Sequence, residues 1–545
     1  MNNYKNVRTW RTAVLCAAIS SSILLSGCKI KVNGDDEDVA TVVDGLVSVA
    51  PDSGADGAAV PGPTISTTSG YVIPADAIYV APDAQGGDDI TNALLLALFE
   101  VADDAVIVMP QGNFIVSETI TVSATNGVTL TGYGINETTL NFDNAAGDDA
   151  FRFEGGNNIT IRDFGVYEAN KNGIKVVGAN GIHIAYTATV WEGPLEADNG
   201  AYGLYPLQSQ NILMEHNYAF GSADAGIYVG QSNNIVVRNN TAKNNVAGIE
   251  IENSTMADVY NNLAVGNAAG ILAFDLPGLE QGYGGNVRIF SNDAYANNTD
   301  NVGNGAVGIA PPGTGMLIFA VSNVEIYNNN LTDNETSAIE LASYFLADSD
   351  VENYPANYGL TMANGWSPLM KNIYMHDNLI ARNGSNPRGS LLADVILGYS
   401  SPFNAKGAPQ VFPAIIYGGI GELLSNAGAL VDFNGFVGSS AAADGVNYNP
   451  YSANDLICAN NNVNGNPAPS YEDVNTGLVY GTDPTDPNNW NADFTAPQAS
   501  LLIDQMVNNT YLNCVQNRLP AAVVTFKGRT YGCTGDDLAE QACSL

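Results

Sequence analysis

A repeated unit in the middle of the chain is the feature that most constrains its fold. The segment 233–254, NNIVVRNNTAKNNVAGIEIENS, holds two apolar runs, IVV and IEI, set between Asn-rich turns. Alternating apolar residues indicate short buried strands, whereas Asn favours turns. Similar segments begin at residues 158, 180, 211, 234, 256, 286, 323 and 372, so the shortest spacing is 22–23 residues and the longer gaps hold loops. A fixed period of this size is typical of a stacked repeat fold.

Each repeat also carries a second apolar strand directly after a Gly or an Ala. A coil of this length has room for about three short strands joined by tight turns. Successive coils would stack about 4.8 Å apart, so that backbone groups pair with the coils above and below. The pattern therefore predicts an all-β stack of parallel coils around one core. The second strands are Gly173–Val176, Gly226–Val229, Gly248–Ile251, Gly270–Ala273 and Ala338–Leu341, and the expected core includes Ile159, Ile161, Ile235, Val237, Ile249 and Ile251.

Asn also recurs six residues into most repeats, with Phe164 and Thr187 as the exceptions. Stacked side-chain amides at one turn can hydrogen-bond along the axis of a stack, and they also satisfy buried polar groups of the turn. We therefore expect most of the Asn to be structural. The predicted ladder consists of Asn217, Asn240, Asn262, Asn292, Asn329 and Asn378.

These repeats resemble the right-handed parallel β-helix family, also described as pectin-lyase-like, over roughly residues 76–385. They are most similar in style to the repeats of mannuronan epimerases and of NosD-type periplasmic proteins. The resemblance implies a single-stranded right-handed parallel β-helix. It implies less about activity, because this fold hosts lyases, hydrolases, epimerases, adhesins and inert spikes.

The N-terminus has the pattern of an export signal. Basic residues precede the apolar run Ala13–Leu25, whose 13 residues are too few to span a bilayer. The run ends in Leu-Ser-Gly-Cys, which resembles the lipobox of bacterial lipoproteins and implies cleavage before Cys28 and lipidation of that residue. Lys29 in the next position favours the outer membrane or cell surface, and several acyl chains would anchor the protein stably. A soluble exported protein is the alternative.

The remaining chain divides by composition and by its cysteines. A helix over Asp89–Asp104 would cover the open end of the stack, whose terminal strands otherwise present unpaired backbone groups. Disulfides persist in exported chains, and Cys458–Cys514 with Cys533–Cys543 is the pairing of sequence neighbours among three possibilities. The expected parts are a signal peptide (1–27), a flexible tether (28–72), an N-terminal cap with the first coils (73–155), the repeats (156–385), further strands (386–455) and a disulfide-stapled C-terminal cap (456–545).

The chain is strongly acidic, with a formal net charge of −37 at pH 7. Residues 1–27 carry three basic groups and no acid, so the chain without them has 16 − 56 = −40 charges. Such a surface repels nucleic acid and anionic polymers unless cations intervene. We therefore expect no nucleic-acid partner, and solubility in a salty medium explains the charge equally well.

The positions of the loops point to a candidate site. Insertions fall on either side of the Gly-preceded strand and never between the starting Asn and the ladder Asn. Thr189–Gly200 and Asp293–Gly313 come before this strand, and Asp275–Gly285 and Ala342–Pro368 come after it. Long loops in a compact stack are more often functional than idle. We expect the two sets to wall a trough whose floor is the outward side of that strand column.

The floor and its rim carry residues suited to carbohydrate. Tyr rings stack on sugar faces, carboxylates and amides hydrogen-bond hydroxyls, and Lys can pair with a uronate. The alternative is that these side chains only solvate a sheet. The predicted ligand contacts are Tyr202, Tyr205, Gln208, Tyr228, Gln231, Glu340 and Trp366, and the predicted catalytic candidates are Lys175, Asp224, Glu250 and Glu252.

The resemblance to epimerases does not extend to their catalytic motif. Those enzymes carry Tyr-Gly-Phe-Asp-Pro-His, where this chain has Tyr-Gly-Leu-Tyr-Pro-Leu from Tyr202 onward. Tyr205 and Leu207 replace the Asp and the His, and neither can transfer a proton in the same way at neutral pH. The three His are well apart and the GGxGxD calcium repeat is absent, so we expect no metal site, although acidic loops could bind Ca²⁺ weakly.

The sequence therefore favours a lipid-anchored β-helix protein that binds a polysaccharide. A polysaccharide lyase or hydrolase is the enzymatic alternative, with Lys175 as a candidate base. A structural, adhesive or complex-assembly protein without catalysis is the other alternative, and the sequence identifies no protein partner.

Overall fold

The computed structural model describes residues 41–43, 46–48, 69–344, 347–348, 354–368, 370–390, 392, 414–418, 457–460, 462–464, 500–502, 514–533 and 543. The chain forms two compact units, Met1–Asp56 and Gly57–Leu545. In the first unit, β1 (Thr41–Val43) pairs antiparallel with β2 (Leu46–Ser48). The predicted signal peptide and Cys28 lie outside the described residues, within which no helix is long and apolar enough to cross a membrane.

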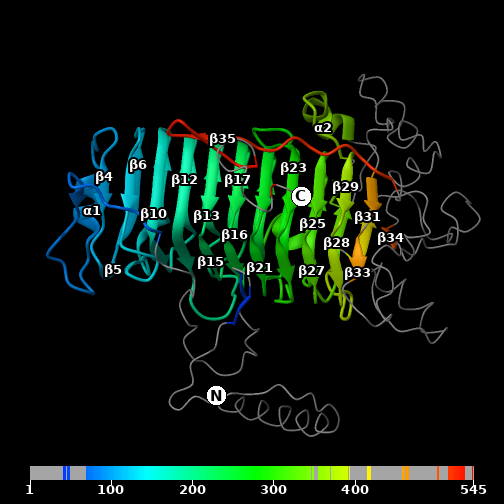
Figure 1. The fold of residues 1–545 in the computed structure, drawn as a ribbon, viewed down its shortest axis with the longest axis horizontal. Helices are drawn as coiled ribbons and strands as arrows, with labels where there is room; N and C mark the ends of the chain where they lie inside the picture. Colours follow the sequence, from blue (N-terminus) through cyan, green and yellow to red (C-terminus); the bar gives the residue numbers. More distant parts are fainter. Residues whose placement is uncertain are drawn as a thin grey trace, which may run out of the picture. The chain divides into compact units, whose positions relative to one another are not determined.

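The second unit is a stack of coils, and each full coil contributes strands to three columns (Figure 1). Neighbouring strands within a column are parallel, except for the last strand of the third column, and this confirms the predicted fold. The first column contains β3 (Ile78–Tyr79), β4 (Val106–Val108), β7 (Thr129–Thr131), the first parts of β10 (Asn157–Tyr167) and β12 (Asn180–Val190), β14 (Gln210–Glu215), β17 (Asn233–Arg238), β20 (Thr255–Tyr260), β23 (Gly285–Phe290), β26 (Val324–Tyr327), β29 (Ile373–His376) and β32 (Ile457–Asn460).

The other two columns complete the coils. The second column contains β5 (Gly112–Ile115), β8 (Thr138–Asn141), the later parts of β10 and β12, β15 (Tyr218–Phe220), β18 (Thr241–Lys243), β21 (Leu263–Val265), β24 (Asp293–Tyr295), β27 (Asn330–Thr332), β30 (Leu379–Ala381) and β33 (Val463–Asn464). The third column contains β6 (Glu118–Ser123), β9 (Ala146–Glu154), β11 (Asn172–Val177), β13 (Tyr202–Leu207), β16 (Ala225–Gly230), β19 (Ala247–Glu252), β22 (Ala269–Phe274), β25 (Thr314–Phe319), β28 (Ser337–Ala342), β31 (Ile415–Gly418) and β34 (Ser500–Leu502).

The core is continuous because equivalent apolar residues face each other from coil to coil. Ile159, Ile182, Ile212 and Ile235 occupy the same position in four consecutive coils, and each is 0% exposed. Burial of an Ile side chain contributes about 1.5–3 kcal/mol, so one such row stabilises the stack substantially. The last strand, β34, pairs antiparallel with β31 and thereby ends the parallel third column.

One repeat begins a residue later than predicted. The register pairs Asn157 with Asn180 and Asn180 with Gln210, so Gly181 is the equivalent of Asn158. This position has a left-handed backbone, with φ of 54° at Asn158 and 86° at Gly181. Asn and Gly both tolerate that conformation, so a Gly can begin a repeat where an Asn was expected.

The predicted Asn ladder is confirmed. Asn262 donates from Nδ2 to Asn292 Oδ1 at 3.0 Å and to Val237 O at 2.9 Å. Its Oδ1 accepts from both the backbone N and the Nδ2 of Asn240, each at 3.0 Å. The amide therefore uses all its donors and both acceptor positions inside the protein. All six predicted residues take part, and the ladder continues to Asn462.

A second ladder lies one turn further along each coil and was not predicted. It follows the first ladder by five residues, a spacing that is visible in the sequence as pairs such as Asn240 and Asn245. Its members are Asn245, Asn267, Asn297, Asn334 and Asn383, and each of the first four donates from Nδ2 to the Oδ1 of the next.

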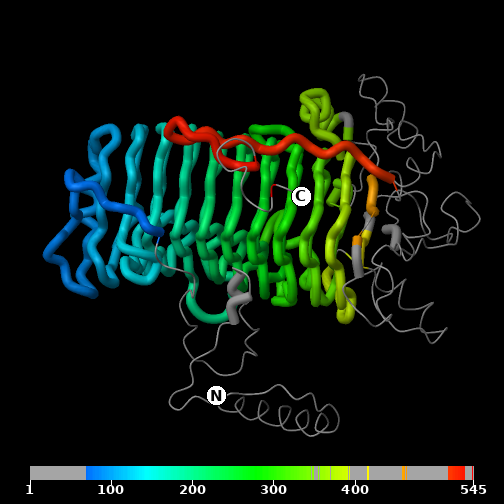
Figure 2. Tube along the Cα trace, in the orientation of Figure 1, coloured from blue at the N-terminus to red at the C-terminus, as the bar shows by residue number. Residues whose placement is uncertain are grey.

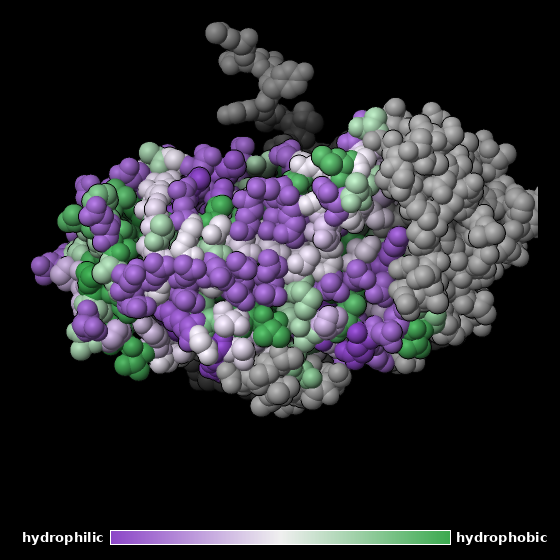
Figure 3. All heavy atoms as spheres, turned by 90° about the horizontal axis from the view of Figure 1, so that it is seen from above, coloured by the Kyte–Doolittle hydropathy of each residue, from purple (hydrophilic) through white to green (hydrophobic). Residues whose placement is uncertain are grey.

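The N-terminal end of the stack is capped by α1 (Thr91–Leu98), which is shorter than the predicted helix. Phe99 is extended, and Glu100 and Asp104 have positive φ, so the chain leaves the helix after two turns. Leu94 and Leu98 are buried against the first coils. Hydrophobic residues remain visible on the surface at this end (Figure 3), where Leu96 is 77% exposed and Phe99 is 72% exposed.

The C-terminal strap, defined as residues 514–533, is the part of the predicted C-terminal cap that runs back along the side of the stack (Figure 2). It passes the first column, contains the hairpin of β35 (Val524–Phe526) and β36 (Arg529–Tyr531), and reaches the first coils, where Lys527 Nζ donates to Gly127 O at 2.9 Å. Both predicted disulfides, Cys458–Cys514 and Cys533–Cys543, are present. The side position follows from the apolar outward residues of the first column, which need cover.

Candidate functional site

The outward side chains of the third column form one row along the stack, as predicted. Strand register places Lys175 opposite Tyr205, Tyr228 opposite Glu250, and Leu272 opposite both Glu250 and Leu317. The row therefore changes from basic to aromatic, then to acidic and then to apolar. Each change falls at a coil boundary, because one residue per coil occupies the row.

The apolar part of this row is closed, so the expected open trough exists only in part. Leu272 and Leu317 are 0% exposed and pack with Val307 and Ala310 of the loop before β25. This loop contains the 3₁₀ helix η1 (Val307–Ile309). The insertion that was expected to wall the trough covers its floor here.

Glu340 and Trp366, two of the predicted ligand contacts, are buried and hydrogen-bonded inside the protein. Glu340 is 2% exposed, and its Oε1 accepts hydrogen bonds from Thr314 Oγ1 at 2.7 Å and Ser337 Oγ at 2.9 Å. Burial raises the pKa of Glu340 to about 7. Trp366, after α2 (Tyr354–Ala363), is 2% exposed and donates from Nε1 to Asp275 O at 2.9 Å.

The open part of the row holds the tyrosine cluster, defined as Tyr202, Tyr205 and Tyr228. Tyr202 and Tyr205 are half-buried, whereas Tyr228 is 3% exposed. The ring centroids of Tyr202 and Tyr205 lie 4.4 Å apart, and that of Tyr228 lies 4.8–4.9 Å from the other two. Lys175 Nζ lies 4.9 Å from the centroid of the Tyr205 ring, within the range of a cation–π contact.

The carboxyl cluster, defined as Asp224, Glu250 and Glu252, adjoins these rings. Glu252 accepts a short hydrogen bond from the Tyr228 hydroxyl, and Asp224 is hydrogen-bonded to Tyr202. Burial raises the pKa of Asp224 to about 7, although the Tyr202 hydrogen bond opposes the shift. Burial and the charges of Asp224 and Glu252 raise the pKa of Glu250 well above its usual range. The cluster therefore holds protons near neutral pH.

Three buried carboxyl oxygens here have no hydrogen-bond partner among the described residues. They are Asp224 Oδ1, Glu250 Oε2 and Asp275 Oδ1. Asp275 follows β22 directly, and burial raises its pKa to about 8. An unpartnered buried polar group costs about 1–3 kcal/mol, and more when it is charged. These oxygens are therefore the groups most in need of an external donor.

Gln208, which is exposed, and Gln231, which is half-buried, both contact a loop. Gln208 Nε2 donates to Glu280 Oε2 at 2.7 Å, and Gln231 Oε1 accepts from the backbone N of Gln281 at 3.2 Å. Both partners lie in the loop after β22. Asp275 and Glu280 were not predicted as site residues. The position of Asp275 at the end of a predicted strand was a usable signal.

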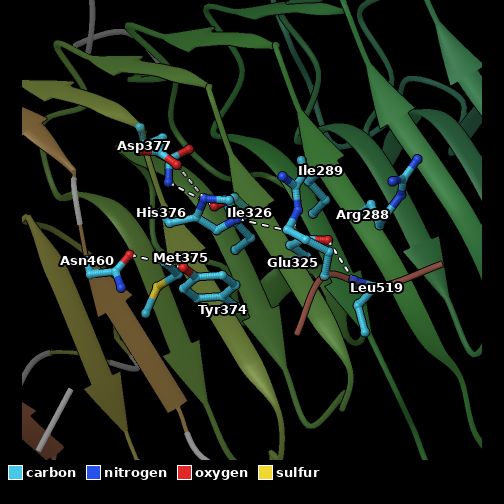
Figure 4. Close-up of polar contacts among 12 residues, drawn as sticks. Arg288, Ile289, Glu325, Ile326, Tyr374, Met375, His376, Asp377, Asn460 and Leu519 are labelled. Atoms are coloured by element: carbon cyan, nitrogen blue, oxygen red, sulfur yellow. Dashed lines mark hydrogen bonds and ion pairs between the residues drawn. The ribbon is translucent and has the colours of Figure 1, made fainter. Parts of the chain in front are cut away.

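The three His lie outside this site. His183 Nε2 contacts Glu215 at 2.9 Å, His376 Nε2 contacts Glu325 at 3.1 Å (Figure 4), and His216 stacks on Tyr186. In the part of the chain that the structure describes, no group of three or more His, Cys, Asp or Glu is arranged to hold a metal ion. Weak Ca²⁺ binding stays a prediction.

The comparison with family models agrees with the fold. Residues 104–278 match the family described as right handed beta helix region. The A-module of mannuronan C-5 epimerase AlgE4 from Azotobacter vinelandii is similar at 14% identity and a TM-score of 0.36, covering 56% of this chain and 89% of that chain. An alginate lyase from Paenibacillus sp. is similar at 16% identity and a TM-score of 0.31, covering 47% of this chain and 92% of that chain.

Likeness at this level says nothing about activity, and no curated protein matches the sequence significantly. The parallel strand register, the stacked Asn ladder and the matched region agree with one another. The chain is a right-handed parallel β-helix protein.

Proposed function

We propose that this protein binds a carbohydrate polymer where the tyrosine cluster adjoins the carboxyl cluster. The observation that carries the proposal is the pairing of half-buried Tyr202 and Tyr205 rings with the unpartnered oxygens of Asp224 and Glu250. Aromatic rings give apolar faces for sugars, and free carboxyl oxygens accept hydrogen bonds from hydroxyl groups.

An extended ligand fits this site better than a compact one. Lys175, Tyr205, Tyr228 and Glu250 come from four consecutive coils in one row. Neighbouring strands lie about 4.8 Å apart, so a chain laid along the row would pass over a different coil at each step. Leu195 and Leu276 come from the loops on the two sides of the row and pack against the apolar cluster that includes Tyr228 and Leu272.

Binding is tested with a panel of neutral, amino and acidic oligosaccharides by isothermal titration. Tyr205→Ala should weaken binding about tenfold, because it removes a stacking face. Tyr133→Ala is the matched control, since this Tyr is 43% exposed on an early coil. If no glycan binds the intact protein, the structural or adhesive role replaces this proposal.

Chemical modification of the bound polymer is a second candidate, favoured by the pKa of Asp224 at about 7. A carboxyl group that titrates near neutral pH can give and take a proton, and Lys175 is a candidate base nearby. Incubation with the same panel should yield reducing ends or unsaturated products, and Asp224→Asn should abolish them. Intact binding without any product would restrict the protein to a binding role.

The proposal includes a lipid anchor at Cys28 on the outer membrane or cell surface. The support is the basic start, the short apolar run and the Leu-Ser-Gly-Cys motif. Replacement of Cys28 by Ala should move the protein from the membrane fraction to the soluble fraction and abolish labelling with a fatty acid. Recovery of the unaltered protein in the soluble fraction would contradict the anchor.

A further inference from the structure

We propose that the preferred ligand of this site is a glycan whose sugars carry positively charged amino groups. The inference rests on the proposed function and names the ligand class. It separates this site from one built for a polymer of uronates. The argument uses the charges, the unpartnered oxygens and one internal cation of the site.

The charges around the site oppose an anionic ligand. The carboxyl cluster, Asp275 and Asp149 all lie at or near it, on a chain with a net charge of −37. The nearby Arg152 is occupied, because its Nε contacts Glu154 at 2.6 Å and its Nη1 contacts Asp149 at 3.5 Å. Within the described part of this face, Lys175 is left as a cation without an ion pair. A uronate would therefore meet net repulsion.

Glu250 gives independent evidence for a donor-rich ligand. It is 3% exposed, and its Oε2 has no hydrogen-bond partner among the described residues. Its neighbours in the row are Tyr228 and Leu272, and Tyr228 gives its hydroxyl proton to Glu252 instead. The carboxyl groups are not arranged to hold a metal ion. An ammonium group supplies three donors and a compensating charge, whereas a hydroxyl supplies one donor and no charge.

Lys175 shows where such an ammonium can lie. Its own ammonium is placed over the Tyr205 ring at 4.9 Å, and this ring packs on Tyr202 and Tyr228. Aromatic rings attract cations through the electrons of their faces, and the attraction grows when water is excluded. Glu252 is half-buried at the rim of the same cluster, so an amino sugar can approach a ring and a carboxylate together.

The titration of the site gives this preference a pH signature. The facing groups are Asp224, Glu250, Glu252, Asp275, the three tyrosines and Lys175. Burial raises the pKa of Asp224 to about 7 and that of Asp275 to about 8, so these groups are neutral at acidic pH and charged at alkaline pH. Affinity for a permanently charged trimethylammonium sugar oligomer should therefore rise between pH 5.5 and pH 8, by up to about tenfold per unit. Affinity for the N-acetylated oligomer should not rise.

The test compares an amino form (the trimethylammonium derivative) and the N-acetyl form of a glucosamine oligomer of equal length, titrated into the full chain at pH 8, above the pKa of Asp224. We expect the amino form to bind about tenfold more tightly, as close charge pairs at interfaces do. Glu250→Gln should reduce the ratio of the affinity for the amino form to the affinity for the N-acetyl form. Lys175→Gln should increase this ratio, because the substitution removes a competing cation. Glu137→Gln, an exposed site with the same change in charge, should leave the ratio unaltered.

The outcomes separate the two proposals. Equal affinity for the amino and N-acetyl forms, or a preference for uronates, overturns this inference and leaves carbohydrate binding intact. A ratio that shifts in the same direction in Glu250→Gln and Lys175→Gln also overturns it. Failure of every glycan to bind overturns the proposed function itself. A thermal melt of each variant confirms that it is folded.

Discussion

Two outward faces of the same stack differ in whether the oxygens of their buried acids have hydrogen-bond partners. On the first column, Asp258 accepts from Arg288 Nε at 2.7 Å, and Glu325 accepts from Leu519 N of the C-terminal strap at 3.0 Å (Figure 4). On the third column, oxygens of Asp224 and Glu250 have no partner among the described residues. The two faces also differ in what covers them.

The first column is covered by a segment of the chain that supplies its own donors. Arg518 of the strap pairs with Glu325, and its guanidinium carbon lies 4.1 Å from the centroid of the Tyr327 ring. Tyr260, Phe290 and Tyr327 stack at 4.8 Å intervals beneath apolar strap residues. On this face, the protein's own Arg518 thus places a cation over an aromatic ring and beside a carboxylate. The third column offers the same chemistry with the cation supplied only by Lys175, which is why we infer an external cationic ligand there.

The largest effect should come from releasing the strap. The Cys458–Cys514 disulfide closes a loop with a sequence separation of 56, so replacing both residues by Ala should lower the free energy of unfolding by about 4 kcal/mol. Chemical denaturation measures this change. The Cys533–Cys543 pair, with a separation of 10, should cost less when it is removed. If the shorter loop costs as much, loop entropy is not what holds the strap.

Loss of a paired acid on the first column should be nearly as costly. Asp258→Asn leaves Arg288 without its charge partner, and the Arg288 side chain is only 9% exposed. Breaking a buried ion pair in this way costs about 3 kcal/mol, which a denaturant titration at pH 7 would detect. Asp293→Asn, on a partly exposed side chain, is the control and should change stability by less than about 0.5 kcal/mol. A small loss in Asp258→Asn would mean that the two faces do not differ as described.

The fold was largely predictable because each of its rules is local. Half-buried strands require alternating apolar and polar residues, and left-handed turns require Asn or Gly. A stacked side-chain amide forms its hydrogen bonds with the amides of neighbouring coils. These constraints repeat in every coil, so the equivalence of Asn217, Asn240 and Asn262 is visible in the sequence. The misplacement of one start at Asn180 shows the limit, since Gly181 meets the same backbone requirement.

The site was predictable only as a row of residues. Register placed Lys175, Tyr205 and Glu250 correctly, because one residue per coil occupies the row. Which parts of the row are covered depends on how the long loops fold, and loops have no period. Glu340 and Trp366 were therefore expected to be open when they are buried, and Asp275 was overlooked. The side position of the strap could not be foreseen, since it depends on contacts across nearly the whole stack.

Stability should fall as the pH rises, because of the third column. Burial raises the pKa of Asp224 and Glu340 to about 7 and that of Asp275 to about 8, above their values in an unfolded chain. Groups with raised pKa stabilise the fold while they are protonated, and this contribution is lost as the pH rises through the folded value. We expect unfolding at pH 8 to require about 2 kcal/mol less free energy than at pH 7. Asp275→Asn should flatten the profile, and a profile that rises with pH would contradict the raised pKa of these buried acids.

The smallest change in stability should come from Glu250→Gln, and its sign is the sharpest test of the comparison. The Glu250 carboxyl is buried, and burial together with the charges of Asp224 and Glu252 raises its pKa well above the usual range, which favours the neutral form. An amide of the same shape therefore removes no ion pair, and the free energy of unfolding should change by less than about 1 kcal/mol or increase. Thermal and denaturant unfolding of this variant beside Asp258→Asn gives the contrast in one experiment. A loss in Glu250→Gln as large as in Asp258→Asn would show that Glu250 is already paired inside the protein, and the case for an external ammonium donor would then be withdrawn.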